Sequence, residues 1–181
     1  MRVLFPLLLV CGIVWAREPV RFRHGMVVAQ EQHAADVGAA VLKSGGNAVD
    51  AAVAVALALS VTHPTAGNLG GGGFLLLRTA QGQATFFDFR EQAPLAATHD
   101  MYLGPDGKPT RDSIEGWRAA GVPGTVRGLE LAHSKYGSRD WAELVAPAIK
   151  LAAEGYEISY GQARSMAGSK LLAKFPESRR I

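Results

Sequence analysis

Residues 48–59 are apolar at every position except Asp50, and this stretch constrains the fold more than any other. Gly45-Gly46 before it is a helix stop signal, and Asn47 suits a helix N-cap, so a helix is predicted to start here. Asp50 follows three residues later, where its negative charge favours the helix N-terminus. A helix that is apolar on all faces must be covered on all faces. We therefore expect a multilayered α/β domain.

The surrounding sequence predicts strands and helices on both sides of that helix. Two strands at residues 74–78 and 83–89, joined by a short polar turn containing glycine, predict an antiparallel hairpin. Such a hairpin is not a stable sheet alone, so we expect the chain to be a piece of a larger domain. The other expected elements are a strand at 25–29, a helix at 30–44, an irregular stretch at 94–118, a helix at 125–136, a helix from 141 to about 155 that Pro147 bends or divides, and a helix at 159–175 stopped by Pro176.

The N-terminus has the pattern of a secretory signal peptide. Arg2 is followed by an uncharged apolar run to Trp15, and Ala16 suits a cleavage site. The run is shorter than the roughly 20 apolar residues of a membrane-spanning helix, and the alternative is a buried N-terminal element. We expect residues 1–16 to be removed and the protein to be periplasmic or secreted. Residues 8–11 faintly resemble a lipid-attachment site, although Val10 is bulky for one.

Composition narrows the chemistry of the remaining chain. The 181 residues are 48% hydrophobic and 19% charged, which fits one globular domain. Cleavage after Ala16 would remove Cys11, the only cysteine, leaving no disulfide, cysteine nucleophile or thiolate metal site. It would also lower the formal net charge of +3 by about one, by removing Arg2. A small charge spread along the chain gives no reason to expect nucleic acid or an anionic membrane as a partner.

The glycine run Gly70–Gly73, which leads into the apolar strand at residues 74–78, needs a physical reason. Four consecutive glycines are costly to order, so they indicate either positive φ angles or a close approach of backbone. A phosphate cradle is disfavoured, because no Lys-Ser/Thr follows and a strand comes next instead of a helix. The remaining interpretations are close packing at a tight strand start, or a glycine wall beside a substrate pocket.

Arg90 is the candidate binding residue. It stands in Asp88-Phe89-Arg90-Glu91, at the end of the second predicted strand. A guanidinium group matches a carboxylate bidentately, which lysine cannot do. The alternative is a structural ion pair with Asp88 or Glu91, and residue chemistry alone favours that alternative.

The residues themselves indicate no catalytic group, metal site or cofactor. No serine lies in a Gly-x-Ser-x-Gly setting, and Thr125, in Pro-Gly-Thr-Val, is interpreted as a helix cap. No two histidines have the i, i+4 metal-binding spacing with an acid between them. The histidines are His24, His33, His63, His99 and His133.

Five blocks in order give the chain a recognisable pattern. They are residues 45–52, 67–74, 88–94, 121–128 and 135–137. From about residue 25 to 155 the chain closely resembles the N-terminal part of the gamma-glutamyltranspeptidase (glutathione hydrolase) family. The resemblance implies an N-terminal-nucleophile hydrolase fold, an αββα sandwich of α/β (α+β) class that is only partial here. It also implies a precursor that cuts itself into large and small subunits.

The resemblance further implies a reaction and a role for Arg90. The N-terminal threonine of the small subunit takes a γ-glutamyl group from glutathione or related compounds and passes it to water or an acceptor. The arginine of the Asp-Phe-Arg-Glu block, here Arg90, holds the α-carboxylate of the γ-glutamyl moiety.

The departures from the family pattern are equally informative. The Thr-Thr-His nucleophile block, the residues that bind the α-amino group and the oxyanion-hole glycine pair do not occur in the sequence. We therefore expect residues 17–181 to be the first part of the large subunit, inactive alone, with the small subunit as partner. The alternatives are a relative that acts on β-lactam side chains or on a poly-γ-glutamate capsule, or a non-catalytic module that binds γ-glutamyl peptides or a partner subunit.

Overall fold

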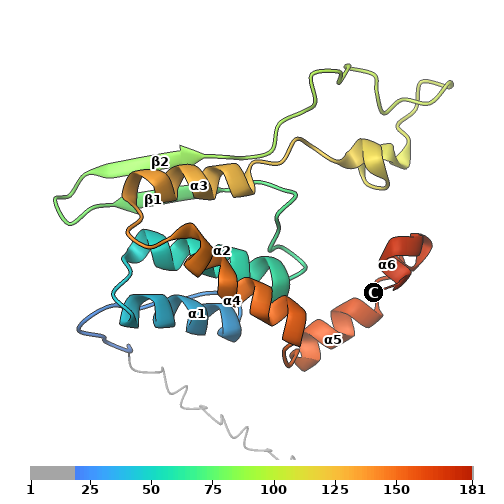
Figure 1. Ribbon diagram of the computed structural model, residues 1–181. Coiled ribbons are helices and arrows are strands. Elements are labelled where there is room, and N and C mark those ends of the chain that lie inside the picture. Colours follow the sequence, from blue (N-terminus) through green and yellow to red (C-terminus); the bar gives the residue numbers. More distant parts are fainter. Residues whose placement is uncertain (1–18, 181) are drawn as a thin grey trace, which may run out of the picture.

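The computed structural model of the protein describes residues 19–180, so the predicted signal peptide and Cys11 lie outside the described residues. Within these residues, two helices are followed by a β-hairpin and then by four more helices (Figure 1). Three short 3-10 turns lie between these elements. The elements are α1 (Gln32–Lys43), α2 (Ala48–Thr62), β1 (Phe74–Arg78), β2 (Ala84–Asp88), α3 (Thr125–Tyr136), α4 (Trp141–Glu154), α5 (Tyr160–Ala167) and α6 (Pro176–Arg180).

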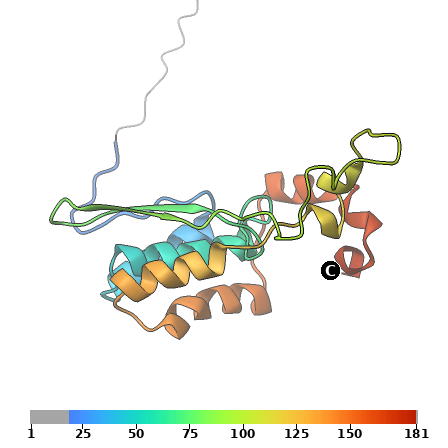
Figure 2. The same cartoon turned by 90° about the horizontal axis from the view of Figure 1, so that it is seen from above.

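The apolar helix α2 lies at the centre of the helical layer. It packs against α1, α3 and α4, and the hairpin lies across α2 and α3 (Figures 1 and 2). Buried residues of α2, among them Val53, Ala54 and Leu57, join Phe87 of β2 and Leu129 of α3 in one core. The burial of these apolar side chains is what holds hairpin and helices together.

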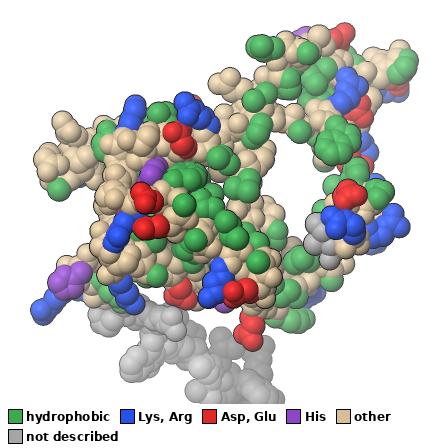
Figure 3. Space-filling model, viewed as in Figure 1, with side chains coloured by type: hydrophobic (Ala, Val, Ile, Leu, Met, Phe, Trp, Pro, Cys, Tyr) green, Lys and Arg blue, Asp and Glu red, His purple; other side chains and the backbone are tan. Residues whose placement is uncertain are grey.

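The coverage of α2 is incomplete within the described residues. Ala52 is exposed, and Ala56 and Leu59 on the same face are only partly buried. A groove of about 410 Å³ separates this face from the start of β1. On the face seen in Figure 3, apolar side chains also gather at the surface. Leu131 of α3 and Ile149 of α4 are among the exposed apolar residues of the described chain. The described residues therefore leave one face of α2 uncovered.

The hairpin matches the sequence prediction in both strands and direction. Its strands pair antiparallel with Leu75 opposite Phe87, and β2 is one residue shorter at each end than predicted. Phe87 is buried and Leu75 is half-buried against the helices. On the opposite face Phe74 and Phe86 are exposed and stack with their ring centroids 5.7 Å apart. The hairpin thus buries one face and leaves the other apolar and open.

Two local predictions need correction, and one of the two alternatives for Pro147 is excluded. Residues 25–29 do not form a strand, because they have no ladder partner; instead Val27 packs against Gly38 of α1. The last predicted helix is also wrong: α5 ends at Ala167 with Gly168 as its cap. Pro176 begins α6 instead of stopping a helix, because its fixed φ suits a first helical turn. Finally, α4 runs through Pro147 without a division.

Asp50 joins the start of α2 to the loop between α3 and α4. Its side chain is fully buried and accepts hydrogen bonds from the Asn47 amide (2.8 Å), the Ser138 amide (2.9 Å) and the Ser138 hydroxyl (2.6 Å). The Arg139 amide adds a longer contact of 3.3 Å. Asn47 and Asp50 form the predicted cap as a reciprocal capping box. Burial raises the pKa of Asp50, but these donors outweigh it, so the pKa lies below its usual value.

The lowered pKa of Asp50 predicts a loss of stability in acid. Unfolded, the carboxyl titrates near pH 4, whereas in the folded protein it titrates lower. Between these values the unfolded state binds more protons, so the stabilisation is complete above about pH 4 and is lost as pH falls through the folded pKa. In urea unfolding of the full-length protein from pH 6 to pH 3, Asp50→Asn should lose less stability than the parent. Parallel losses in the two proteins would contradict this prediction.

Candidate functional site

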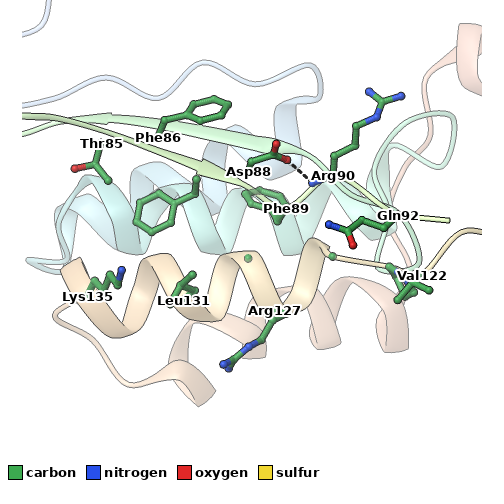
Figure 4. Close-up of a pocket in the computed structure, with 14 residues that line it drawn as sticks. Thr85, Phe86, Asp88, Phe89, Arg90, Gln92, Val122, Arg127, Leu131 and Lys135 are labelled. Carbon is green, nitrogen blue, oxygen red and sulfur yellow. Dashed lines mark hydrogen bonds between the residues drawn. The ribbon is translucent and has the colours of Figure 1, made fainter. Parts of the chain in front are cut away.

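A groove of about 500 Å³ lies between the end of β2 and one side of α3 (Figure 4). From the strand it is lined by Asp88, Phe89 and Arg90, and from the helix by Arg127 and Lys135 among others. Phe87 is buried in the core that the hairpin shares with the helices. By strand alternation Phe89 points the same way, which leaves Asp88 and Arg90 on the outer side. The core therefore anchors the aromatic residues while the charged ones stay accessible.

Arg90 stands at the end of β2 with an exposed side chain. Its backbone amide donates to Asp88 Oδ1 over 3.0 Å. Its guanidinium extends away from α3 (Figure 4), and the ion pairs found within residues 19–180 do not include it. The ion-pair alternative for Arg90 is therefore not formed in the described chain: Asp88 contacts the backbone of Arg90, not its side-chain charge.

The other two cations of the groove are engaged. Arg127 forms an ion pair with Glu130 one turn along α3. Lys135 places its ammonium 5.8 Å from the centre of the Phe87 ring, within the range of a cation–π contact. Arg90 is thus the cation of this groove that has no side-chain partner among residues 19–180, and it is the one most open to an anionic ligand.

The glycine run Gly70–Gly73, directly before β1, lies beside the residues that flank Arg90. Among Gly70–Gly73 no φ angle is positive, so conformational freedom is not what these residues supply. A Cβ atom on Gly72 would lie 2.6 Å from the carbonyl oxygen of Phe89, and closer still to the Glu91 amide. Gly73 exchanges backbone hydrogen bonds with Phe89, which extends the β1–β2 ladder beyond the strands. Close approach of two backbones is the physical reason for glycine at Gly72. A Cβ atom on Gly71 would meet the Asn68 side chain and one on Gly73 the Phe89 ring, whereas at Gly70 the space is open.

This arrangement also bears on the phosphate interpretation. The Gly71 amide donates to Asn68 Oδ1 over 3.0 Å, and the Gly73 amide donates to Phe89. Amides that are already bonded within the protein do not form an anion cradle.

Thr125 has a different role from the one predicted. Gly124 is the N-cap of α3 and no side chain caps this helix, so the cap prediction for Thr125 is wrong. Instead, the Thr125 hydroxyl, which is buried, donates to Asn68 Oδ1 over 2.6 Å. Sequence reasoning missed Asn68 as a contact residue; its place directly before the glycine run was the available signal.

Metal clusters and membrane-spanning helices are both absent from the described residues. Within 19–180, no three or more His, Cys, Asp and Glu side chains are grouped so that they could hold a metal ion. In the same part of the chain, no helix has both the length and the apolar character needed to span a membrane.

Comparisons with known proteins identify the family. The model of the gamma-glutamyltranspeptidase family matches residues 34–181, which is most of the chain. The chain belongs to the gamma-glutamyltranspeptidase family. A glutathione hydrolase proenzyme from Pseudomonas sp. (strain A14) is 52% identical over 147 residues, 81% of this chain and 26% of that protein. The chain thus spans about a quarter of the length of this curated relative.

Solved structures of similar proteins identify the fold. The gamma-glutamyltranspeptidase of Helicobacter pylori superposes with a TM-score of 0.87 at 43% identity, covering 90% of this chain and 47% of that one. A cephalosporin acylase from Bacillus halodurans superposes with a TM-score of 0.72 at 28% identity, covering 88% and 31%. The predicted fold class, a partial N-terminal-nucleophile hydrolase fold of α/β type, is confirmed.

Proposed function

We propose that the full-length protein transfers or hydrolyses γ-glutamyl groups, with glutathione as the donor, and that Arg90 binds the α-carboxylate of the γ-glutamyl moiety. The observation that carries the proposal is the exposed Arg90 side chain at the end of β2, whose guanidinium extends away from α3 and has no ionic partner within residues 19–180. A planar guanidinium accepts a carboxylate through two parallel hydrogen bonds, which fixes both position and orientation.

The nucleophile, the precursor and the export of the protein belong to the same proposal. We assign the nucleophile to an N-terminal threonine outside residues 17–181, in a small subunit cut from the same precursor. The name proenzyme, borne by the Pseudomonas relative, supports such a precursor. An N-terminal threonine can use its own amine as the base that activates the hydroxyl. In the same scheme residues 1–16 are a signal peptide and the protein is exported.

The acylase alternative rests on weaker similarity. The cephalosporin acylase is 28% identical, against 52% for the glutathione hydrolase relative. An exposed guanidinium suits any carboxylate, so the group beside that carboxylate distinguishes the two activities. A γ-glutamyl substrate carries an α-amine there, whereas a glutaryl group carries none.

A comparison of two chromogenic anilides tests the proposal. The full-length protein should release the anilide from the γ-glutamyl substrate. Release from the glutaryl substrate should be at least about tenfold slower, because without the α-amine the polar groups of the site that bind it would be buried unpaired, which is costly. Glutathione should compete with the γ-glutamyl anilide. Preference for the glutaryl anilide would favour the acylase alternative. Binding of γ-glutamyl compounds without any turnover would favour the non-catalytic module, and both results would overturn the proposal.

A further inference from the structure

Two glycines from separate segments press on the same peptide next to Arg90. A Cβ atom on Gly72 or on Gly124 would overlap the carbonyl of Phe89. Real Cβ atoms do not approach backbone this closely, so both positions need glycine for the observed packing. Phe89 is the residue directly before Arg90, and it is held between the glycine run on one side and the start of α3 on the other.

The two segments that carry these glycines are bonded to each other. The carbonyl of Gly71 accepts the amides of Gly124 (2.8 Å) and Thr125 (3.1 Å). The start of α3 donates here too: Asn68 Oδ1 accepts the Thr125 hydroxyl (2.6 Å), and within its own segment it accepts the Gly71 amide (3.0 Å). We call this set of four hydrogen bonds the Asn68–Thr125 clasp. It joins the two segments that approach the Phe89 carbonyl.

The chain is fixed again just beyond Arg90. Gln92 and Val122 exchange backbone hydrogen bonds of 3.2 and 2.8 Å as an isolated antiparallel bridge. Arg90 thus lies between two pinned residues, Phe89 and Gln92, while its own side chain stays exposed. A rigid backbone under an exposed guanidinium reduces the entropy that ligand binding must remove.

We propose that Asn68 and Thr125 are positioning residues that, through the clasp on Phe89, set where the Arg90 guanidinium meets the substrate carboxylate. This inference rests on the proposed function. It adds two residues that influence carboxylate affinity by holding the Arg90 backbone, without contacting the substrate. Asn68 and Thr125 act only through the Arg90 backbone. Their loss should therefore weaken substrate binding more than it slows turnover.

The matched pair Thr125→Val and Thr125→Ser tests this in the full-length protein. Valine keeps the branched shape and removes the donor to Asn68, whereas serine keeps the donor. For the γ-glutamyl anilide, Thr125→Val should raise KM about three- to tenfold with kcat within about twofold of the parent. Thr125→Ser should remain close to the parent. Gly124→Ala should act in the same direction more strongly, and Gly161→Ala on α5, whose added Cβ has only an ordinary contact at 3.9 Å, controls for an added methyl group.

Testing Thr125→Val in the Arg90→Ala variant as well as in the parent separates the failure of this inference from the failure of the proposed function. If Arg90→Ala leaves KM unchanged, the proposed role of Arg90 fails, whatever Thr125 does. If Arg90→Ala raises KM, then Thr125→Val should add less than about twofold in that background, because both act on one contact. The clasp inference is overturned if the effect of Thr125→Val persists undiminished without Arg90, if kcat falls as much as KM rises, or if Thr125→Val matches the parent.

Discussion

Arg90→Ala should lower kcat/KM of the full-length protein for a γ-glutamyl anilide on the order of a hundredfold, mostly through KM. A charged hydrogen bond contributes about 1.5–3 kcal/mol, and a bidentate pair provides two of them. About 2.8 kcal/mol corresponds to a hundredfold change in binding. Arg90 can lose its side chain without unfolding the strand, because that side chain is exposed and its backbone bond to Asp88 remains.

Two controls make the Arg90 result specific. Arg90→Lys should recover little of the loss, since a point charge does not reproduce the planar fork of donors. A 4-aminobutyryl anilide, which retains the amine and lacks the α-carboxylate, should lose less than about threefold in kcat/KM on Arg90→Ala. Equal losses with both anilides would show that Arg90 supports the fold or the chemistry and does not bind the carboxylate. Unchanged turnover at low substrate in both variants would also remove the assignment.

The elements that the sequence predicts well are those whose stability is encoded locally. Asn47 is the expected N-cap, which Asp50 completes as a capping box, and the hairpin and the bounds of α3 follow from alternation and turn residues. The failures have the opposite origin. Residues 25–29 have strand composition, but a strand requires a partner that lies elsewhere in the chain. The predicted role of Pro176 as a helix stop is wrong because proline suits the start of a helix as well as its end.

The candidate site was predictable in part for the same reason. The chemistry of Arg90 is legible in its residue type, but whether its charge is paired depends on where Asp88 and Glu91 point in three dimensions. The glycine run indicated either positive φ or close approach, and only the position of Phe89 selects the second. Asn68 and Thr125 are 57 residues apart, and no local pattern brings them together. Tertiary contacts of this kind cannot be predicted from the local patterns of a single sequence.

Asp50→Ala should have the largest effect on stability, about 3–5 kcal/mol. The substitution removes the acceptor for the amides of Asn47, Ser138 and Arg139 and for the Ser138 hydroxyl. Buried donors without an acceptor keep their full desolvation penalty, and the cavity left at a fully buried position adds to it. Because the same carboxylate ties α2 to the loop after α3, the loss should spread to the packing of α4 on α2.

Thermal unfolding and soluble yield of the full-length protein measure this effect of Asp50. Asp36→Ala is the matched control, since Asp36 is an exposed aspartate on the neighbouring helix whose side chain, within residues 19–180, accepts a hydrogen bond from Gln32 alone, one turn away. It should change the free energy of unfolding by less than about 0.5 kcal/mol. Asp50→Asn should fall between the two, because the amide keeps one acceptor oxygen and turns a donor toward the remaining amides. If Asp50→Ala and Asp36→Ala unfolded at the same temperature, the carboxylate would not be the tie that its four donors indicate.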